Sequence, residues 1–292
     1  MKKLILICVS IFMFSNICLA SGVSPTATSA DCDNATLSTY SGTTNLQANW
    51  EPNTIDITWY NGNDVFATNS CVYDDILTLP SGTPTKTGYT FDGWRVRVPG
   101  DYTELEYIES SGTQYIDTGI IGKTGISVEA KFMLNTTENG SLIGNRMASN
   151  TRFWPAMWWE QKWNATIGGD SYGKHSTTVS ANTIYITYFQ SSLYGWTFDV
   201  NGTRIVSGTE TINNTNNMWL FGTNNGRDNP STLQYPFKGR VYYVKIWNNG
   251  TVVRNFIPVK NSDNVVGVYD TVSQTFFTNS GTGVFIAGPV VR

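Results

Sequence analysis

The sequence is poor in charge and almost without histidine. Asp, Glu, Lys and Arg make up 14% of its 292 residues, and His175 is the single histidine; an average domain has about 25% charged residues. The 19 basic residues do not outnumber the 22 acidic ones, so no positive surplus is available to bind a nucleic-acid backbone. Without a second histidine, a histidine-based metal or acid–base site is disfavoured. We therefore expect no nucleic-acid partner and no histidine-based chemistry.

Long hydrophobic runs are missing apart from the N-terminus. There, Lys2 and Lys3 precede an apolar run over residues 4–14, and a small residue follows at Ala20. This pattern is typical of a secretory signal peptide, which we place at residues 1–20. The run is shorter than the roughly 20 residues that span a bilayer. We expect a secreted, cell-surface or periplasmic protein whose mature chain is soluble and does not insert into a membrane.

Cysteine is scarce as well. Of four cysteines, Cys8 and Cys18 belong to the predicted signal peptide, which leaves Cys32 and Cys71. An even pair in an exported chain favours a disulfide between them. In chain-entropy models, closing a loop of about 40 residues contributes roughly 3–4 kcal/mol. Two free thiols are the alternative.

Aromatic and β-branched residues are abundant instead. Aromatics reach 13%, and they lie in short alternating runs such as residues 55–59 and 241–247, which are followed by Asn- and Gly-containing turns. Helical periodicity is nearly absent. The pattern predicts an all-β protein built as a sandwich or barrel.

The chain divides into four parts by composition. Small polar residues follow the signal peptide and predict a flexible leader over residues 21–31. The turn-forming PGD run at 99–101 separates a compact segment, residues 32–98, from a larger one, residues 102–292.

The first segment ends in a specific aromatic motif. Residues 84–94 read PTKTGYTFDGW. This run resembles the closing motif of the Listeria–Bacteroides repeat, the internalin B-type repeat family. The resemblance implies a small β-grasp-like module that spaces or presents other domains in surface proteins, with Tyr89, Phe91 and Trp94 as anchors of a small core.

The second segment carries motifs at both of its ends. It opens with LEYIESSGTQYIDTG at residues 105–119, and FKGRVYYVKIW follows at residues 237–247. Both runs resemble the laminin-G-like, concanavalin A-like jelly-roll domains of bacterial surface and phage proteins. The resemblance implies a two-sheet antiparallel jelly-roll sandwich, a fold that hosts lectins, adhesive domains, hydrolases and lyases.

The carboxylate pattern of a jelly-roll glycosidase is absent. Such enzymes carry a Glu-x-Asp-x-Glu type motif on one strand, whereas the acidic residues of the second segment are scattered singly. We therefore expect non-catalytic, adhesin-like binding, with a glycan or a cell-surface protein as partner. One alternative is a structural surface or fibre component that makes protein–protein contacts. Another is a divergent glycan-active enzyme.

A tryptophan-rich run is the main candidate binding site. Residues 153–163 read FWPAMWWEQKW. Sugar rings stack on exposed indoles, and neighbouring polar side chains bind hydroxyl groups, so the predicted ligand-binding residues are Trp154, Trp158, Trp159, Glu160, Gln161 and Trp163. Regular alternation would place Trp154 with Trp158 on one face and Trp159 with Trp163 on the other. The alternative is that these tryptophans fill the core or a sheet rim, and residues 193–196 (LYGW) are interpreted as strand core.

No cofactor is certain, but calcium is possible. Calcium takes oxygen ligands from loops, and the loop at residues 222–230 supplies Asn224, Asn225 and Asp228 as candidate ligands. An ordinary Asn-rich loop is the alternative.

Overall fold

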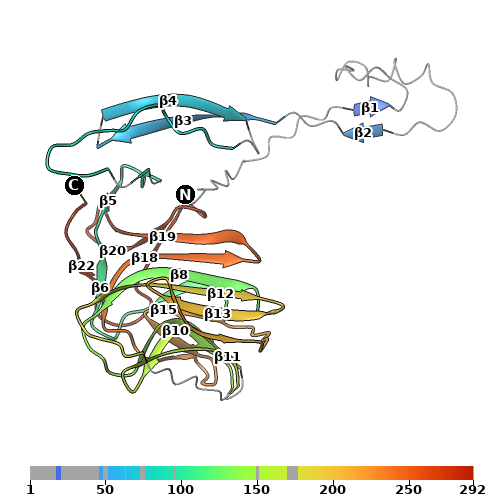
Figure 1. Ribbon diagram of the computed structural model, residues 1–292, viewed down its shortest axis with the longest axis vertical. Helices are drawn as coiled ribbons and strands as arrows, with labels where there is room; N and C mark the ends of the chain where they lie inside the picture. Colours follow the sequence, from blue (N-terminus) through green and yellow to red (C-terminus); the bar gives the residue numbers. More distant parts are fainter. Residues whose placement is uncertain are drawn as a thin grey trace. The chain divides into compact units, whose positions relative to one another are not determined.

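The computed structural model describes most of the chain from residue 52 onward (Figure 1). The described residues are 18–20, 46–48, 52–62, 64–72, 76–91, 93–94, 96–148, 151–169 and 177–291. Most of the predicted signal peptide, the predicted leader, Cys32 and His175 lie outside them. The described chain consists of strands joined by turns and loops, so the predicted all-β fold is confirmed. In these ranges, no helix is long and apolar enough to cross a membrane. The chain forms two compact units, one through Trp94 and one from Arg95.

Among its described residues, the first unit forms two antiparallel strand pairs. They are formed by β1 (Cys18–Ala20) with β2 (Leu46–Ala48), and by β3 (Thr54–Asn61) with β4 (Asp64–Val72).

Trp94 of the aromatic motif packs against the β3–β4 hairpin, whereas the prediction of Tyr89 as a core anchor is wrong, since Tyr89 is 62% exposed. The ring of Trp94 lies 5.0 Å from that of Trp59, 5.3 Å from that of Phe66 and 5.3 Å from that of Phe91. Edge-on and tilted ring contacts of this kind stabilise a small core. Cys71 lies on β4 and forms no disulfide with a described residue. Because Cys32 is outside those residues, the bridge between them stays a prediction.

The larger sheet of the second unit is antiparallel throughout. Its strands are β5 (Tyr102–Glu104), β6 (Ile108–Ser110), β8 (Ile126–Leu134), β12 (Ile184–Ser192), β13 (Gly195–Val200), β14 (Thr203–Gly208), β18 (Gly239–Asn248), β19 (Thr251–Asn261), β20 (Val266–Asp270), β21 (Thr275–Thr278) and β22 (Ile286–Ala287). Eight of them follow the order β14-β13-β12-β8-β18-β19-β20-β21. At the side, β5 pairs with β19, β6 with β18, and β22 with β6.

The smaller sheet carries the tryptophan-rich run. Its strands are β7 (Ile116–Ile121), β9 (Gly140–Arg146), β10 (Arg152–Trp159), β11 (Lys162–Gly168), β15 (Asn217–Leu220), β16 (Gly222–Asn225) and β17 (Thr232–Gln234). The order is β11-β10-β9-β15-β7. β16 runs parallel to β9 and pairs with β17 in an antiparallel manner.

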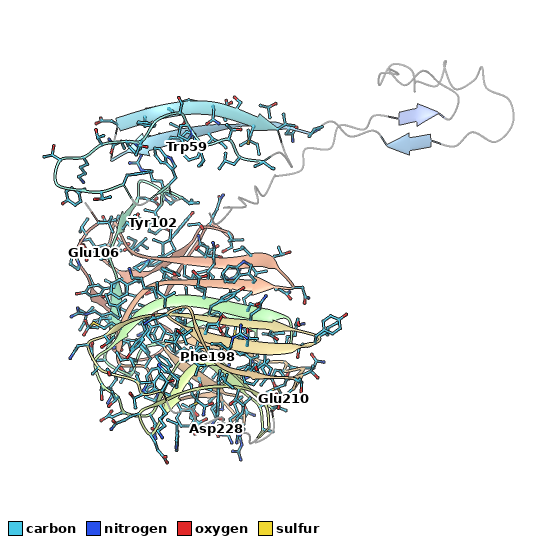
Figure 2. All side chains as sticks on the ribbon, in the orientation of Figure 1. Trp59, Tyr102, Glu106, Phe198, Glu210 and Asp228 are labelled. Carbon is cyan, nitrogen blue, oxygen red and sulfur yellow. The ribbon has the colours of Figure 1, made fainter. Side chains whose placement is uncertain are left out.

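The inner faces of the two sheets enclose one hydrophobic core. Phe132 on β8 meets Trp163 on β11 with 6.1 Å between ring centroids, and Phe153 on β10 meets Phe189 on β12 at 5.5 Å. Phe198, on β13, is fully buried in the same interior (Figure 2). The second unit is therefore a two-sheet β-sandwich, as predicted.

The opening motif is tied to the end of the chain through Gln114. Its Oε1 accepts hydrogen bonds from the Ser110 hydroxyl at 2.8 Å and the Ser111 amide at 2.9 Å, and its Nε2 donates to the Val284 carbonyl at 3.1 Å. Both Ser110 and Gln114 are buried. This one carboxamide therefore shapes the 110–113 turn and joins it to a segment about 170 residues later.

We expect Gln114→Ala to lower the free energy of unfolding by about 1–3 kcal/mol, because the buried Ser110 hydroxyl would lose its acceptor. Denaturant unfolding followed by tryptophan fluorescence measures this loss. Gln190→Ala, at an exposed strand position, is the matched control and should change stability by less than about 0.5 kcal/mol. Equal stability of the two variants would contradict the anchoring role of Gln114.

Candidate functional site

The prediction that the tryptophan-rich run forms an exposed binding platform is wrong for three of its four tryptophans. Trp154, Trp158 and Trp163 are 0%, 1% and 0% exposed. Trp158 and Trp163 are cross-strand partners that face the core together, with 6.4 Å between ring centroids. A register shift between Trp154 and Met157 turns Trp158 to the face opposite Trp154, and the two-residue turn at 160–161 then places Trp163 beside Trp158 on that inner face.

The remaining predicted residues lie at the outer end of the β10–β11 hairpin. Glu160 and Gln161 form its two-residue turn, with φ of 49° and 61°, and both are exposed. Trp159 is half-buried, and its ring lies 5.6 Å from that of Tyr235. Trp154 also packs edge-on against Tyr235, at 5.5 Å. On this side of the smaller sheet, Tyr235 therefore packs against the indole rings of Trp154 and Trp159. Of the six predicted ligand-binding residues, only Trp159, Glu160 and Gln161 remain accessible.

The candidate calcium ligands make hydrogen bonds around the β16–β17 connection through the Asn224 and Asn225 amide nitrogens and the Asp228 carboxylate, whereas the two amide Oδ1 atoms are buried without a hydrogen-bond partner among the described residues. Asn224 is buried and donates from Nδ2 to the Asn217 carbonyl at 2.8 Å. Asn225 donates to Asp228 Oδ2 at 2.9 Å, and the Thr232 hydroxyl donates to the same oxygen. No group of three or more His, Cys, Asp or Glu able to hold a metal occurs in the described part of the chain. The set offers one carboxylate and two amide groups, so calcium at this loop stays a prediction.

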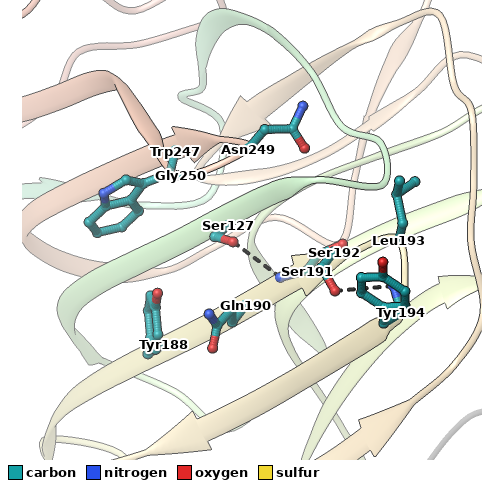
Figure 3. Close-up of a pocket in the computed structure, with 10 residues that line it drawn as sticks. All are labelled: Ser127, Tyr188, Gln190, Ser191, Ser192, Leu193, Tyr194, Trp247, Asn249 and Gly250. Atoms are coloured by element: carbon teal, nitrogen blue, oxygen red, sulfur yellow. Dashed lines mark hydrogen bonds between the residues drawn. The ribbon is translucent and has the colours of Figure 1, made fainter.

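An open pocket lies on the outer face of the larger sheet (Figure 3). Its volume is about 460 Å³. The tip of the β12–β13 hairpin borders it with Tyr194, and the β18–β19 turn borders it with Asn249. Strand positions on the sheet form its floor, among them Tyr188, Gln190 and Trp247.

Strand alternation explains why these side chains face outward. On β12 the burial pattern alternates strictly, with Phe189 in the core and its neighbours Tyr188 and Gln190 outside. On β18, Ile246 is in the core and Trp247 is outside. Antiparallel pairing through β8, which lies between β12 and β18, then brings the outward residues of the two strands into one site.

Two aromatic rings, those of Tyr188 and Trp247, contact each other in the floor of the pocket. Tyr188 and Trp247 meet edge to face, with 5.9 Å between ring centroids, and the Lys245 ammonium lies 5.6 Å from the Trp247 ring centroid. Both aromatic side chains are half-buried, so each keeps an accessible surface. Burial raises the pKa of Tyr188, and the nearby Glu129 and Asp199 carboxylates raise it further. Its hydroxyl therefore remains protonated, and able to donate, at neutral pH.

Polar groups surround the rings. Gln190, Ser192 and Asn249 are exposed at the pocket, while the Ser127 hydroxyl accepts a hydrogen bond from the Ser191 amide at 3.1 Å (Figure 3). An aromatic floor with a few convergent hydrogen-bonding groups is typical of small-ligand sites.

Sequence reasoning missed this pocket. It interpreted residues 193–196 as strand core; this holds for Trp196, which is 7% exposed, but Leu193 and Tyr194 are 79% and 93% exposed at the hairpin tip. The available signal was the outward set of the alternating runs that end at Tyr188 and Trp247. Pairing between those runs was not readable from the sequence.

Comparisons with known proteins give only distant structural similarity. No family model and no curated protein matches the sequence. A proposed carbohydrate-binding protein from Bacteroides ovatus is similar with a TM-score of 0.44 and 10% identity, over 65% of this chain and 61% of that one. A heptameric SAP-like pentraxin from Limulus polyphemus is similar with a TM-score of 0.36 and 8% identity, over 52% of this chain and 76% of that one. The chain thus spans about three fifths of the length of the first protein, and neither similarity is close enough to indicate function.

Proposed function

We propose that this protein is a non-catalytic glycan-binding protein and that the pocket between β12, β8 and β18 is its binding site. The observation that carries the proposal is the accessible Tyr188–Trp247 pair beside Gln190, Ser192 and Asn249. The C–H face of a sugar ring packs on an aromatic ring, while its hydroxyl groups need nearby hydrogen-bond donors and acceptors. The pocket offers both within one open site.

The carboxylates near the pocket favour binding over hydrolysis. Glu129 accepts a hydrogen bond from the Tyr243 hydroxyl at 2.9 Å, and Asp199 is ion-paired with Arg204. Tyr188 lies between them, paired with Glu129 on one side and Asp199 on the other. A glycosidase needs two carboxyl groups facing the same scissile bond, whereas here a tyrosine separates two engaged groups.

We further propose an exported, adhesin-like protein in which the first unit acts as a repeat-type spacer for the sandwich. The N-terminal signal pattern and the PTKTGYTFDGW motif support this arrangement. The packing of Trp94 on the β3–β4 hairpin gives the first unit a small aromatic core of its own.

The glycan-binding proposal is tested by a glycan array and then by titration of the strongest bound glycan, with calcium and with a chelator. We expect Trp247→Ala to weaken binding at least tenfold, because truncating a central aromatic contact costs more than about 1.4 kcal/mol. Trp159→Ala, a half-buried tryptophan on the other sheet, is the matched control and should leave the affinity unchanged. Unfolding curves of both variants serve to check that each remains folded.

Two outcomes would overturn the proposal. Absence of any bound glycan would move the function to protein partners and a structural role. Loss of binding in Trp159→Ala, with Trp247→Ala unaffected, would move the site to the smaller sheet.

A further inference from the structure

The pocket continues into a row of outward side chains along β18. We call this row the β18 strip and define it as Arg240, Tyr242, Tyr243, Lys245 and Trp247. The inward residues of the same strand, such as Val241, Val244 and Ile246, are buried in the core. A register shift between Val241 and Tyr243 lets two successive tyrosines remain partly accessible. At about 3.4 Å per residue, the strip extends roughly 24 Å from the pocket, which is longer than one sugar ring needs.

Aromatic rings recur along the strip, and most have a cation near one face. Lys245 lies over Trp247 at the pocket, and Lys131 on β8 lies 5.3 Å from the centroid of Tyr242. At the far end, Arg240 lies 4.5 Å from the Tyr107 ring, which meets Tyr242 at 5.5 Å. The stacking surface therefore continues past the pocket, as an extended chain of sugars would require.

Not every basic side chain along the strip forms an ion pair with a carboxylate. Arg240 forms an ion pair with Glu109 at 2.8 Å, and Glu129 accepts a hydrogen bond from Tyr243 at 2.9 Å. Lys131 lies two residues after Glu129 on β8, and Lys245 on β18 is the cross-strand partner of Glu129. Neither lysine forms an ion pair with a described residue. Two ammonium groups beside aromatic rings thus remain available to a bound anion.

We infer that the β18 strip binds an extended polysaccharide whose sugars carry carboxylate groups, with one unit in the pocket and following units along β18. The inference rests on the proposed glycan-binding function and adds the length and charge of the ligand. Sugar rings stack on Trp247 and the strip tyrosines, while sugar carboxylates pair with Lys245 and Lys131. Neutral glycans gain the stacking contacts but not the ion pairs.

Galacturonate oligomers of one to six units test this inference, with the same oligomers fully methyl-esterified as neutral probes of equal length. Isothermal titration calorimetry on the full chain should give affinities that rise with length up to about four or five units. At low salt the free acids should bind about tenfold more tightly than the esters, since two exposed ion pairs add up to about one decade. This preference should shrink as salt rises.

The charge preference should depend on the two lysines alone. The double variant Lys131→Gln, Lys245→Gln should bind acids and esters equally, while keeping the affinity for the ester. The double variant Lys86→Gln, Lys162→Gln has the same net charge, changes exposed lysines off the strip, and should behave as the unmodified protein.

Different experimental results would contradict the β18 strip and the proposed glycan-binding function. Binding that needs Trp247 but is equal for one and six units, or equal for acid and ester, would overturn the strip and leave the pocket. Binding of no oligomer, combined with an empty glycan array, would overturn both.

Discussion

Trp163→Ala should destabilise the protein by about 3–5 kcal/mol, the range for removing a buried large aromatic side chain. Trp163 is fully buried, and its ring meets four others from both sheets: Tyr185 at 4.9 Å, Phe198 at 5.9 Å, Phe132 at 6.1 Å and Trp158 at 6.4 Å. Truncation would leave a cavity that these rings cannot fill without moving from their own contacts.

Denaturant unfolding curves measure this loss, and Trp159→Ala four positions earlier is the control. Trp159 is half-buried on the outer side of the smaller sheet, so its removal should cost clearly less. Trp163→Phe should recover part of the lost stability, because it restores an aromatic ring without the indole's second ring. If Trp163→Ala were as stable as Trp159→Ala, the tryptophan run would not be part of the core.

The strands of the sandwich could be predicted from the sequence because their alternation is clear. The run that ends at Tyr188 places every second residue inside, and the run that ends at Trp247 does so except at the bulge around Tyr242; these strands occur as β12 and β18. Alternation depends only on backbone geometry, so one sequence suffices to reveal it.

The site was harder to predict because it depends on register. Counting by two along residues 153–163 groups Trp154 with Trp158 and separates Trp158 from Trp163. The bulge between Trp154 and Met157 breaks the first grouping, and the two-residue turn, which pairs Trp158 with Trp163, puts both on the inner face. The pocket combines Tyr188 and Trp247, which are brought together only because β8 pairs with both β12 and β18. Neither a bulge nor the pairing of distant strands is specified by the local pattern.

The buried carboxylate of Asp270 should be the other position at which a substitution destabilises the protein most. Asp270 is 0% exposed at the end of β20, and the following turn is built around it. Its Oδ1 accepts hydrogen bonds from the amides of Asn255 at 2.7 Å and Val272 at 3.2 Å. Its Oδ2 accepts from the Ser273 hydroxyl at 2.6 Å and the Ser273 amide at 3.2 Å. Arg254 Nη1 lies 3.5 Å from the same oxygen.

We expect Asp270→Ala to lower the free energy of unfolding by about 3–5 kcal/mol, because it removes one member of a buried ion pair and the acceptor of several hydrogen bonds. Asp270→Asn keeps the shape and one acceptor oxygen but removes the charge opposite Arg254, so its loss should be smaller. Denaturant unfolding of the two variants beside the unmodified protein separates these contributions. The Asp199→Ala variant is the matched control: Asp199 pairs with the exposed Arg204 on the sheet surface, where an ion pair contributes at most about 1 kcal/mol. If Asp270→Ala cost no more than Asp199→Ala, the β19–β20 end of the sandwich would be held by packing alone, and the hydrogen bonds at Asp270 would be a consequence of the turn and not its cause.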